Sequence, residues 1–256
     1  MPQQVDLTKN HLLHGDCLLL SKMIPDQTID LILDDPPFPG KTENFSSRMD
    51  SLDMIECVSL DLYLSWWDRV CQEKARILKK KGWFIFKSDD FTSKLIYQIT
   101  QKYFDYYGDI VWDKIAISMG YSIRKRHELL CFYRLKNHTH YFKKPCNIPS
   151  LLNETDIVRL LKIQKGIWGI DPIHINQTPT LLWAPIIDRF CPESGIIADF
   201  FMGSGSIPIA MRKLNSKRRY WGCEITNTDQ NSYVDYAKAE FKKTTQIKIT
   251  TQQTLF

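Results

Sequence analysis

Short apolar runs alternate along this chain with longer segments in which apolar residues recur every three or four positions. Residues 29–34, Ile-Asp-Leu-Ile-Leu-Asp, form the clearest run and predict a short buried strand of a parallel sheet. Residues 60–78 show the clearest helical spacing, with Leu60, Leu64 and Trp67 on one face. The same patterns predict strands at 11–14, 83–86, 106–112, 128–134, 196–200 and 219–223, and helices at 18–23, 91–100, 180–190, 206–214 and 232–241. Strands that alternate with helices indicate an α/β fold.

The composition is that of a globular protein with a sizeable core. The chain has 256 residues, of which 43% are hydrophobic and 25% charged, enough for one large domain or two small ones. No apolar run approaches the ~18 residues that span a bilayer. Residues 1–6 lack a basic region and an apolar core, and the seven cysteines never occur as Cys-x-x-Cys, so we expect a cytoplasmic protein with reduced thiols. The net charge of +5 is compatible with a polyanionic partner without requiring one.

Polar segments interrupt the predicted elements. Residues 39–57 show no periodicity, and we expect them to form a mobile loop over the end of the 29–34 strand. Lys79-Lys80-Lys81-Gly82 is interpreted as the cationic end and glycine cap of the preceding helix, rather than as a nucleic-acid patch. Thr178 is expected to cap the helix that begins near Thr180.

Residues 135–176 resist assignment, which favours an insert or a partner-reading segment rather than part of the core. A basic stretch at 120–127 precedes this segment. His138, His140 and Cys146 could imitate a metal site, but they lack a second cysteine pair, so we expect no metal.

A rigid elbow follows the 29–34 strand. Pro36 and Pro37 stop both strand and helix, because each proline fixes φ and removes a hydrogen-bond donor. The elbow carries the acceptor carboxylate of Asp35, backbone carbonyls that no strand ladder uses, and the ring of Phe38. Two acceptors beside a stacking ring suit a flat heterocycle that bears an amino group. On this stretch alone, a Pro-Pro turn that merely leaves a strand is an equal alternative.

Residues 199–206, Asp-Phe-Phe-Met-Gly-Ser-Gly-Ser, form the second candidate centre. Glycines directly after a buried strand let the backbone approach a ligand and open a helix N-terminus towards it. Twenty-one residues after Gly203, Glu224 ends the next predicted strand, at the spacing where nucleotide-binding folds place an acid on ribose hydroxyls. This combination favours an adenosine-containing cofactor, although Gly203-Ser204-Gly205 lacks the third glycine of the dinucleotide fingerprint. The alternatives are a helix start with an incidental acid and a nicotinamide-dependent oxidoreductase.

Together the two centres resemble the DNA amino-methyltransferases, which use S-adenosylmethionine to methylate the exocyclic amine of adenine or cytosine. The family's Asp/Asn/Ser-Pro-Pro-aromatic tetrapeptide is matched by Asp35-Pro36-Pro37-Phe38, and its cofactor loop by residues 199–205. The catalytic motif comes first, as in the circularly permuted β order of that family. Further matches are His14-Gly15-Asp16-Cys17, Ile24-Pro25-Asp26, Ile29-Asp30-Leu31, Gln177-x-Pro179 and Trp221-Gly222-Cys223-Glu224-Ile225.

The resemblance covers most of residues 11–241. It implies a Rossmann-like methyltransferase fold, with a mostly parallel twisted sheet and helices on both faces, as a single catalytic domain over residues 1–256. Three positions depart from the family pattern. Phe200 stands where proline is usual, Thr178 where a lysine is common before Pro179, and Ser206 where threonine is usual. None of these changes removes a chemically required group.

The resemblance also implies catalytic roles for the elbow. Asp35 and the Pro36 carbonyl would accept both protons of the target amine, at a bend that Pro37 completes. Two acceptors that favour a tetrahedral nitrogen turn its lone pair towards the methyl donor, and the carboxylate stabilises the positive charge that develops. Phe38 would stack on the base after it leaves the duplex. For the cofactor, the resemblance implies that Asp16 binds the amine of its adenine and that Glu224 binds its ribose. The methionine end would be held by Asp199, Phe201, Gly203, Ser204 and Gly205.

The reaction that the resemblance implies is site-specific methylation of adenine N6 in DNA. Asp is commoner at the first tetrapeptide position in adenine enzymes, and Ser in cytosine enzymes. Cytosine N4 methylation is the nearest alternative, followed by an RNA substrate and by a silent binding module that keeps the fold. Residues 124–127 and the target-recognition segment 135–176 would contact phosphates and read bases, and an ordinary surface without such a role is the equal alternative. A homodimer and an accompanying restriction endonuclease are compatible with the family, and the sequence decides neither.

Overall fold

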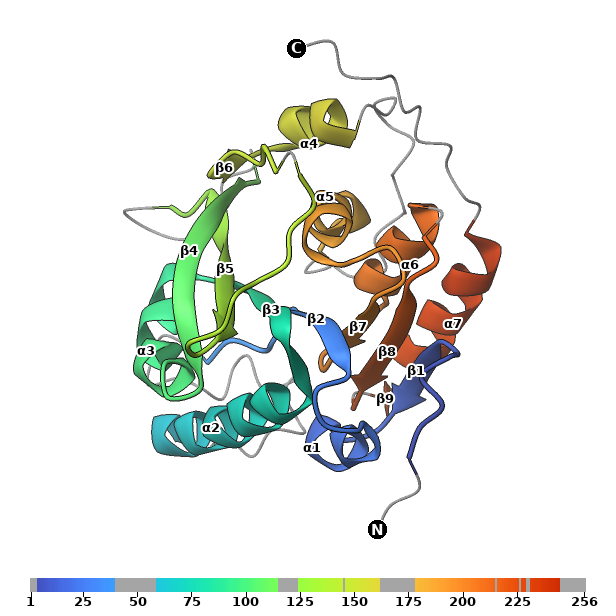
Figure 1. Cartoon of the computed structure of the whole chain (residues 1–256), viewed down its shortest axis with the longest axis horizontal. Coiled ribbons are helices and arrows are strands. Elements are labelled where there is room, and N and C mark those ends of the chain that lie inside the picture. The colour runs from blue at the N-terminus through green and yellow to red at the C-terminus, as the bar shows by residue number, and fades with distance from the viewer. Residues whose placement is uncertain are drawn as a thin grey trace.

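A single mixed sheet organises the described part of the chain. The computed structural model describes residues 4–39, 59–114, 124–144, 146–161, 178–214, 216–225, 227–228 and 231–244. Within these ranges eight strands form one sheet in the order β1-β8-β7-β2-β3-β5-β4-β6 (Figure 1). The strands are β1 (His11–His14), β2 (Ile29–Asp34), β3 (Leu78–Ser88), β4 (Phe104–Asp113), β5 (His127–Leu135), β6 (Leu151–Leu152), β7 (Ile196–Asp199) and β8 (Arg219–Glu224). A separate pair, β9 (Asn227–Thr228) and β10 (Asn231–Ser232), is antiparallel.

Five neighbouring strands run in the same direction. β1 pairs with β8, β8 with β7, β7 with β2 and β2 with β3, all in parallel register. β5 is antiparallel to both β3 and β4, and β6 is parallel to β4. The mostly parallel sheet that the sequence predicts is therefore confirmed. Its carboxyl edge brings together the ends of β1, β8, β7 and β2, which is where open α/β sheets bind their ligands.

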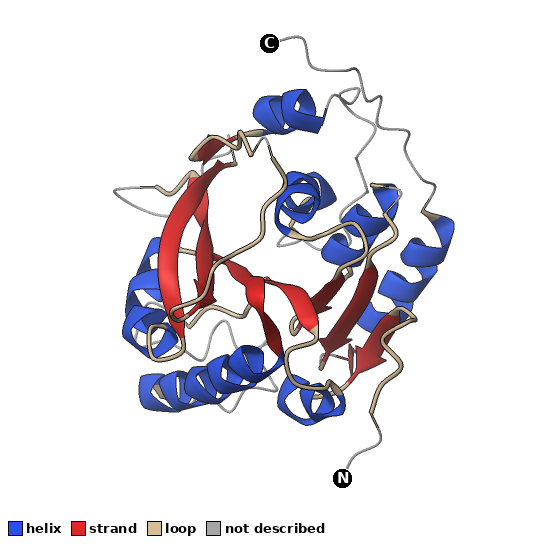
Figure 2. Cartoon of the chain, viewed as in Figure 1, coloured by secondary structure: helices blue, strands red, loops and turns tan. Residues whose placement is uncertain are grey.

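Helices cover both faces of the sheet, as Figure 2 shows. On one face lie α1 (Cys17–Leu20), the 3-10 turn η1 (Ser21–Met23), α2 (Leu60–Ile77) and α3 (Asp90–Thr100). The other face carries α5 (Thr180–Phe190), α6 (Ser206–Lys213) and α7 (Tyr233–Lys243), with α4 (Glu154–Leu161) beside β6 (Figure 1). Successive residues of β2 serve the two faces: Leu31 joins the core with Trp183 of α5, and Ile32 the core with Trp67 of α2. Both faces of β2 are thus buried, as its unbroken apolar run predicts.

The lysine run does not end a helix, contrary to the sequence-based interpretation. α2 ends at Ile77, and Lys79, Lys80 and Lys81 belong to β3, where the register against β2 shifts. Gly82 does not have the positive φ of a helix cap. Its lack of a side chain matters for packing instead, because a Cβ there would lie 2.9 Å from the carbonyl oxygen of Asp30.

Parts of several predicted segments lie outside the described residues. These are residues 40–57 of the loop expected over the elbow, residues 120–123 of the basic stretch, and residues 145 and 162–176 of the expected target-recognition segment. The described part of that last segment contains β6, which pairs with β4, and α4.

Membrane-spanning helices, clusters of metal ligands and disulfides are all absent from the described residues. None of the described helices is both long and apolar enough to cross a membrane. The described residues contain no cluster of three or more His, Cys, Asp or Glu side chains arranged to hold a metal ion. The described cysteines, at 17, 71, 131, 146, 191 and 223, are all free thiols.

Candidate active site

The two candidate centres lie side by side at the carboxyl edge of the sheet. Asp35 follows β2 and Asp199 ends β7, and these two strands are direct neighbours. The backbone N–H of Phe200 donates to Oδ1 of Asp34 over 2.8 Å, which joins segments 166 positions apart. The chain therefore brings the elbow and the glycine loop to one place, as the sequence predicts.

The carboxylate of Asp35 is held from two other elements. Its side chain is 27% exposed, so it remains accessible to a ligand. The Thr178 hydroxyl donates to Oδ2 over 2.6 Å, and the ammonium group of Lys87, from β3, lies 3.0 Å from the same oxygen. The prediction that Thr178 caps α5 is wrong: Pro179 occupies the cap position, with no side-chain hydrogen bond, because the Thr178 hydroxyl is turned to Asp35 instead.

Lys87 lies within an acidic and cationic network that the sequence does not reveal. Its Nζ atom lies 3.1 Å from Oε2 of Glu128 on β5, and Lys114 lies 2.7 Å from Oε1 of the same glutamate. Burial opposes the charged form of Lys87, but the carboxylates of Asp35 and Glu128 outweigh it and raise the lysine pKa. For Glu128, burial favours the neutral acid, but the two lysines outweigh it and lower the pKa. In the sequence Lys87 directly follows the predicted strand 83–86 and carries no signal of this network.

Helix α2 braces the elbow against the glycine loop. The hydroxyl of Tyr63 donates to the carbonyl of Pro37 over 3.1 Å. The Tyr63 ring lies 5.5 Å from that of Trp66, which lies 5.6 Å from the ring of Phe201, measured between centroids. A chain of aromatic contacts thus runs from one centre to the other. The helical spacing of α2 predicts which of its faces is buried but gives no sign of this bridging role.

Two glycines with positive φ shape the loop between β7 and α6. Gly203 has a φ of +51°, and a Cβ added there would meet nothing within 4 Å. Its N–H donates to Oε2 of Glu224, at the end of β8, over 2.7 Å. Gly205, with a φ of +86°, is the N-cap of α6, and a Cβ there would lie 2.7 Å from that of Ala237 on α7. Gly203 therefore leaves the loop open on its outer side, while Gly205 allows close helix packing.

Asp199 supports this loop from beneath. Its side chain is fully buried, accepting from the Tyr220 hydroxyl over 2.7 Å and from the N–H of Phe201 over 3.0 Å. Burial, reinforced by the nearby carboxylate of Asp34, raises its pKa well above the ordinary value. The buried Asp199 side chain therefore supports the backbone of the loop, and its contact with the methionine end of the cofactor stays a prediction.

Asp34, which directly precedes the elbow, forms a fully buried ion pair with Lys74 of α2. The two charged atoms lie 2.6 Å apart, and neither side chain is exposed. The Lys74 ammonium is surrounded by aromatic rings, with centroids 4.4–5.3 Å away, from Trp67, Phe84, Phe200 and Phe201. Phe200, the departure from the family's proline, supplies both a ring to this cage and the N–H that Asp34 accepts.

The remaining predicted residues lie on the same edge or close to it. Asp16 is half-buried and caps α1, accepting from the N–H of Leu18 over 2.7 Å, and the N–H of Gly15 donates to the Glu224 carbonyl. Ser204 is buried. Two cations of the basic stretch are paired with acids: Lys125 lies 2.6 Å from Asp90, and Arg126 lies 2.6 Å from Asp113.

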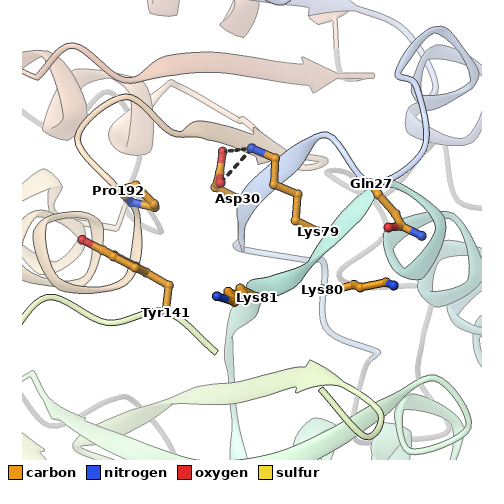
Figure 3. A pocket seen from close by; sticks show the side chains of 7 residues that line it. All are labelled: Gln27, Asp30, Lys79, Lys80, Lys81, Tyr141 and Pro192. Carbon is orange, nitrogen blue, oxygen red and sulfur yellow. Dashed lines mark hydrogen bonds and ion pairs between the residues drawn. The ribbon is translucent and has the colours of Figure 1, made fainter. Parts of the chain in front are cut away.

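A cavity of about 360 Å³ lies at the opposite, amino edge of the sheet, where β2 and β3 begin. It is lined by Gln27, Asp30, Lys79, Lys80, Lys81, Tyr141 and Pro192, and the ammonium group of Lys79 is paired with Asp30 (Figure 3). None of the residues of the elbow or the glycine loop lines it, so this cavity is separate from the candidate active site.

The fold matches solved methyltransferases over nearly its whole length. The PvuII DNA methyltransferase (cytosine-N4-specific) superposes with a TM-score of 0.62 at 13% identity, covering 94% of this chain and 98% of its own. The M1.HpyAVI–SAM complex superposes with a TM-score of 0.58 at 18% identity, covering 90% and 97%. At these identities the likeness shows a shared fold, the Rossmann-like methyltransferase fold.

Relatives with closer sequences are DNA methyltransferases. The DNA adenine methyltransferase YhdJ of Escherichia coli (strain K12) is 34% identical over 253 residues, covering 84% of this chain and 78% of YhdJ. The type II methyltransferase M.HinfI of Haemophilus influenzae is 25% identical over 270 residues, covering 95% and 71%. The model of the N6/N4 methyltransferases, described as DNA methylase, matches residues 29–238, which include both candidate centres. The chain belongs to this family of DNA amino-methyltransferases, and not to the nicotinamide-dependent oxidoreductases that the glycine loop alone left open.

Proposed function

We propose that this protein transfers a methyl group from S-adenosylmethionine to N6 of an adenine in DNA, at the Asp35-Pro36-Pro37-Phe38 elbow. One observation carries the proposal: the elbow and the glycine loop meet at adjoining strand ends, joined by the bond from the Phe200 N–H to Asp34. A reaction between two bound molecules needs both of them at one place, and holding them in line supplies much of the rate.

The cofactor-binding role rests on the loop and its flanking acids. Gly203 leaves open space on the outer side of the loop, where its missing Cβ would otherwise project. Glu224 lies beside this space, and a carboxylate that accepts from Gly203 retains capacity to accept from ribose hydroxyls. Asp16, at the end of the neighbouring strand β1, would accept from the amine of the cofactor's adenine. When bound, S-adenosylmethionine supplies an electrophilic methyl group on a sulfonium.

The target-binding role rests on the elbow. Asp35 and the Pro36 carbonyl accept the two N–H bonds of the amine, which turns the nitrogen lone pair out of conjugation with the ring. Positive charge develops on that nitrogen, and a fixed carboxylate stabilises it more than water would. Pro37 holds the bend, tied by its carbonyl to Tyr63. Phe38, half-buried beside the elbow, stacks on the flipped base.

Adenine is favoured over cytosine as the target. The relative with 34% identity is named a DNA adenine methyltransferase, whereas the structure named cytosine-N4-specific shares 13% identity. Asp at the first elbow position points the same way. Residues 135–176, with α4 beside the outer strands, are proposed to contact the DNA and read the bases around the target.

The test is methyl transfer by the purified chain. Tritiated S-adenosylmethionine and unmethylated genomic DNA should give labelled N6-methyladenine on nucleoside analysis, and sequencing of the modified positions gives the recognition site. Asp35→Ala should lower the transfer rate by ~10²-fold or more, because it removes the charge that stabilises the transition state. Its affinity for S-adenosylmethionine, measured by calorimetry, should remain within about twofold.

A matched control is Asp30→Ala, which removes an aspartate at the other end of β2. Asp30 pairs with Lys79 at the amino edge, away from the elbow. Labelled N4-methylcytosine instead of N6-methyladenine would overturn the choice of base. An Asp35→Ala variant with near-normal turnover would overturn the catalytic assignment.

A further inference from the structure

We propose that Lys87 is a positioning residue for methyl transfer: together with Thr178 it holds one oxygen of the Asp35 carboxylate, so that the other oxygen faces the target amine. This inference rests on the proposed function. It assigns a role to a buried lysine that neither the elbow motif nor the glycine loop contains.

The contacts form a closed triangle around Oδ2 of Asp35. Lys87 Nζ lies 3.0 Å from that oxygen and 2.7 Å from the Thr178 hydroxyl, and this hydroxyl lies 2.6 Å from the same Oδ2. Within the described residues, the contact from Lys87 and the hydrogen bond from Thr178 both go to Oδ2 of Asp35. The arrangement therefore occupies one oxygen and presents Oδ1 as the acceptor for a ligand.

The ammonium group itself is held by one hydrogen bond and two ion pairs. It donates to Oγ1 of Thr178, and Oδ2 of Asp35 and Oε2 of Glu128 lie 3.0 and 3.1 Å from it as ion-pair partners. Only 8% of the Lys87 side chain is exposed. The position of the charge is consequently set by three different segments: the end of β2, the start of β5 and the residue that precedes Pro179.

The two carboxylates explain why a cation is needed at this point. Asp35 and Glu128 lie 3.0 and 3.1 Å from the same nitrogen, so without it two negative groups would face each other at short range. The Asp35 carboxylate would then move away from Glu128 and would no longer be oriented toward the target amine. Displacement of a reacting group by about 1 Å can cost ~10²-fold in rate.

The experiment compares Lys87→Met, Lys87→Arg and Thr178→Val with wild type, using tritiated methyl transfer from S-adenosylmethionine to unmethylated plasmid DNA. Lys87→Met should lower kcat by about 10- to 100-fold and leave the calorimetric affinity for S-adenosylmethionine within about twofold. Lys87→Arg should retain more of the rate, because it keeps the charge. Thr178→Val, which removes only the hydroxyl, should lower kcat by a smaller factor, about three- to tenfold.

The exchange variant Lys87→Thr/Thr178→Lys separates positioning from simple stability. The two side-chain atoms lie 2.7 Å apart, so the exchange returns an ammonium group to nearly the same place from the other segment. The kcat of the exchange variant should be at least tenfold higher than that of Lys87→Met. Lys79→Met is the matched control: it removes a lysine of the same strand that also pairs with an aspartate, at the opposite edge, and should keep the wild-type kcat.

The outcomes are distinct. If Lys87→Met does not fold in a thermal denaturation scan, Thr178→Val and the exchange variant decide the question. A kcat within twofold of wild type for the folded Lys87 and Thr178 variants overturns this inference while leaving the proposed function in place. A wild-type chain that binds S-adenosylmethionine but transfers no methyl group to DNA overturns the proposed function, and this inference with it.

Discussion

Two consecutive aspartates show how strongly surroundings determine what a residue does. Asp34 is fully buried, paired with Lys74 and closed in by aromatic rings, so it can only hold the structure together. Asp35, one residue later, lies outside the strand and is partly exposed. It keeps access to a ligand. The same side chain thus provides structural support in one position and a candidate acceptor in the next, because the strand ends between them.

Glu128 should make the stability of the protein depend on pH in a specific way. Its pKa is lowered in the folded chain, so its contribution to stability is present above its unfolded pKa of ~4.5 and is lost as the pH falls through the folded value. Glu128→Gln should therefore have a lower free energy of unfolding than wild type at pH 7. The difference should shrink steadily below pH ~4.5.

Urea denaturation at several pH values measures that difference. Glu193→Gln, at an exposed glutamate, is the control. Its free energy of unfolding should differ from that of wild type by a small amount that hardly changes with pH. A wild-type advantage over Glu128→Gln that stays constant from pH 7 to pH 3.5 would contradict the ion-pair account.

At the scale of elements, β2 and β7 are locked together where the two centres meet. The lock is the bond from the Phe200 N–H to the buried Asp34, whose other oxygen is paired with Lys74 of α2. A strand, a loop and a helix are therefore fixed by one carboxylate. Proline, the residue usual in the family at position 200, has no N–H and could not donate this bond. Phe200 therefore makes two interactions here: its N–H donates to Asp34, and its ring contacts the Lys74 ammonium group.

Phe200→Pro should destabilise the chain more than Phe200→Leu does. Both variants lose the ring, but only proline also loses the N–H and leaves a buried acceptor without its partner. We expect the free energy of unfolding of Phe200→Pro to be lower by about 1–3 kcal/mol than that of Phe200→Leu. Chemical denaturation of both variants checks this, and equal stabilities would show that the Phe200 N–H contributes nothing.

The elements could be predicted from the sequence because their signals are local. The apolar run at 29–34 and the helical spacing at 60–78 agree closely with β2 and α2. The lysine run was misread because three cations and a glycine look like a helix end, whereas β3 accommodates them by a shift in register. The prediction for Thr178 was wrong for a similar reason. A hydroxyl directly before a helix usually caps that helix, and only the three-dimensional fold shows that this hydroxyl donates to Asp35 instead.

The site could be predicted only as far as its residues lie within motifs. Asp35, Gly203 and Glu224 occupy motif positions, and parallel strands bring them to one edge. Lys87 and Tyr63 reach the elbow from β3 and α2 through contacts between residues far apart in sequence. No pattern of spacing along the chain encodes such contacts, so these two residues became apparent only in three dimensions.

At the scale of the whole molecule, the residues proposed to bind the cofactor and those proposed to bind the target lie on different halves of the sheet. The strands β1, β8 and β7 carry Asp16, Glu224 and the glycine loop, and β2 with β3 and β5 carries the elbow and its charged support. The proposed cofactor site and the proposed target site therefore meet at the boundary between β7 and β2.

This division predicts separable defects. Glu224→Ala should raise the dissociation constant for S-adenosylmethionine by about tenfold, because it removes acceptors for the ribose and the anchor of the Gly203 N–H. At saturating cofactor its kcat should stay within a few fold of wild type, since the elbow is unchanged. Calorimetry and steady-state kinetics measure the two effects. An unchanged dissociation constant would count against the ribose assignment.

The pairing of β1 with β8 has a consequence for how the protein is made. During synthesis the stretch that becomes β1 leaves the ribosome long before its neighbour in the sheet, which is completed only when residues 219–224 have been added. Likewise, β2 is without one of its two flanking strands until β7 emerges. An incomplete chain thus exposes unpaired strand edges, which favour aggregation. The proposed cofactor site can assemble only after residues 219–224 have been added, so binding of S-adenosylmethionine would report a chain in which β1 and β8 have paired.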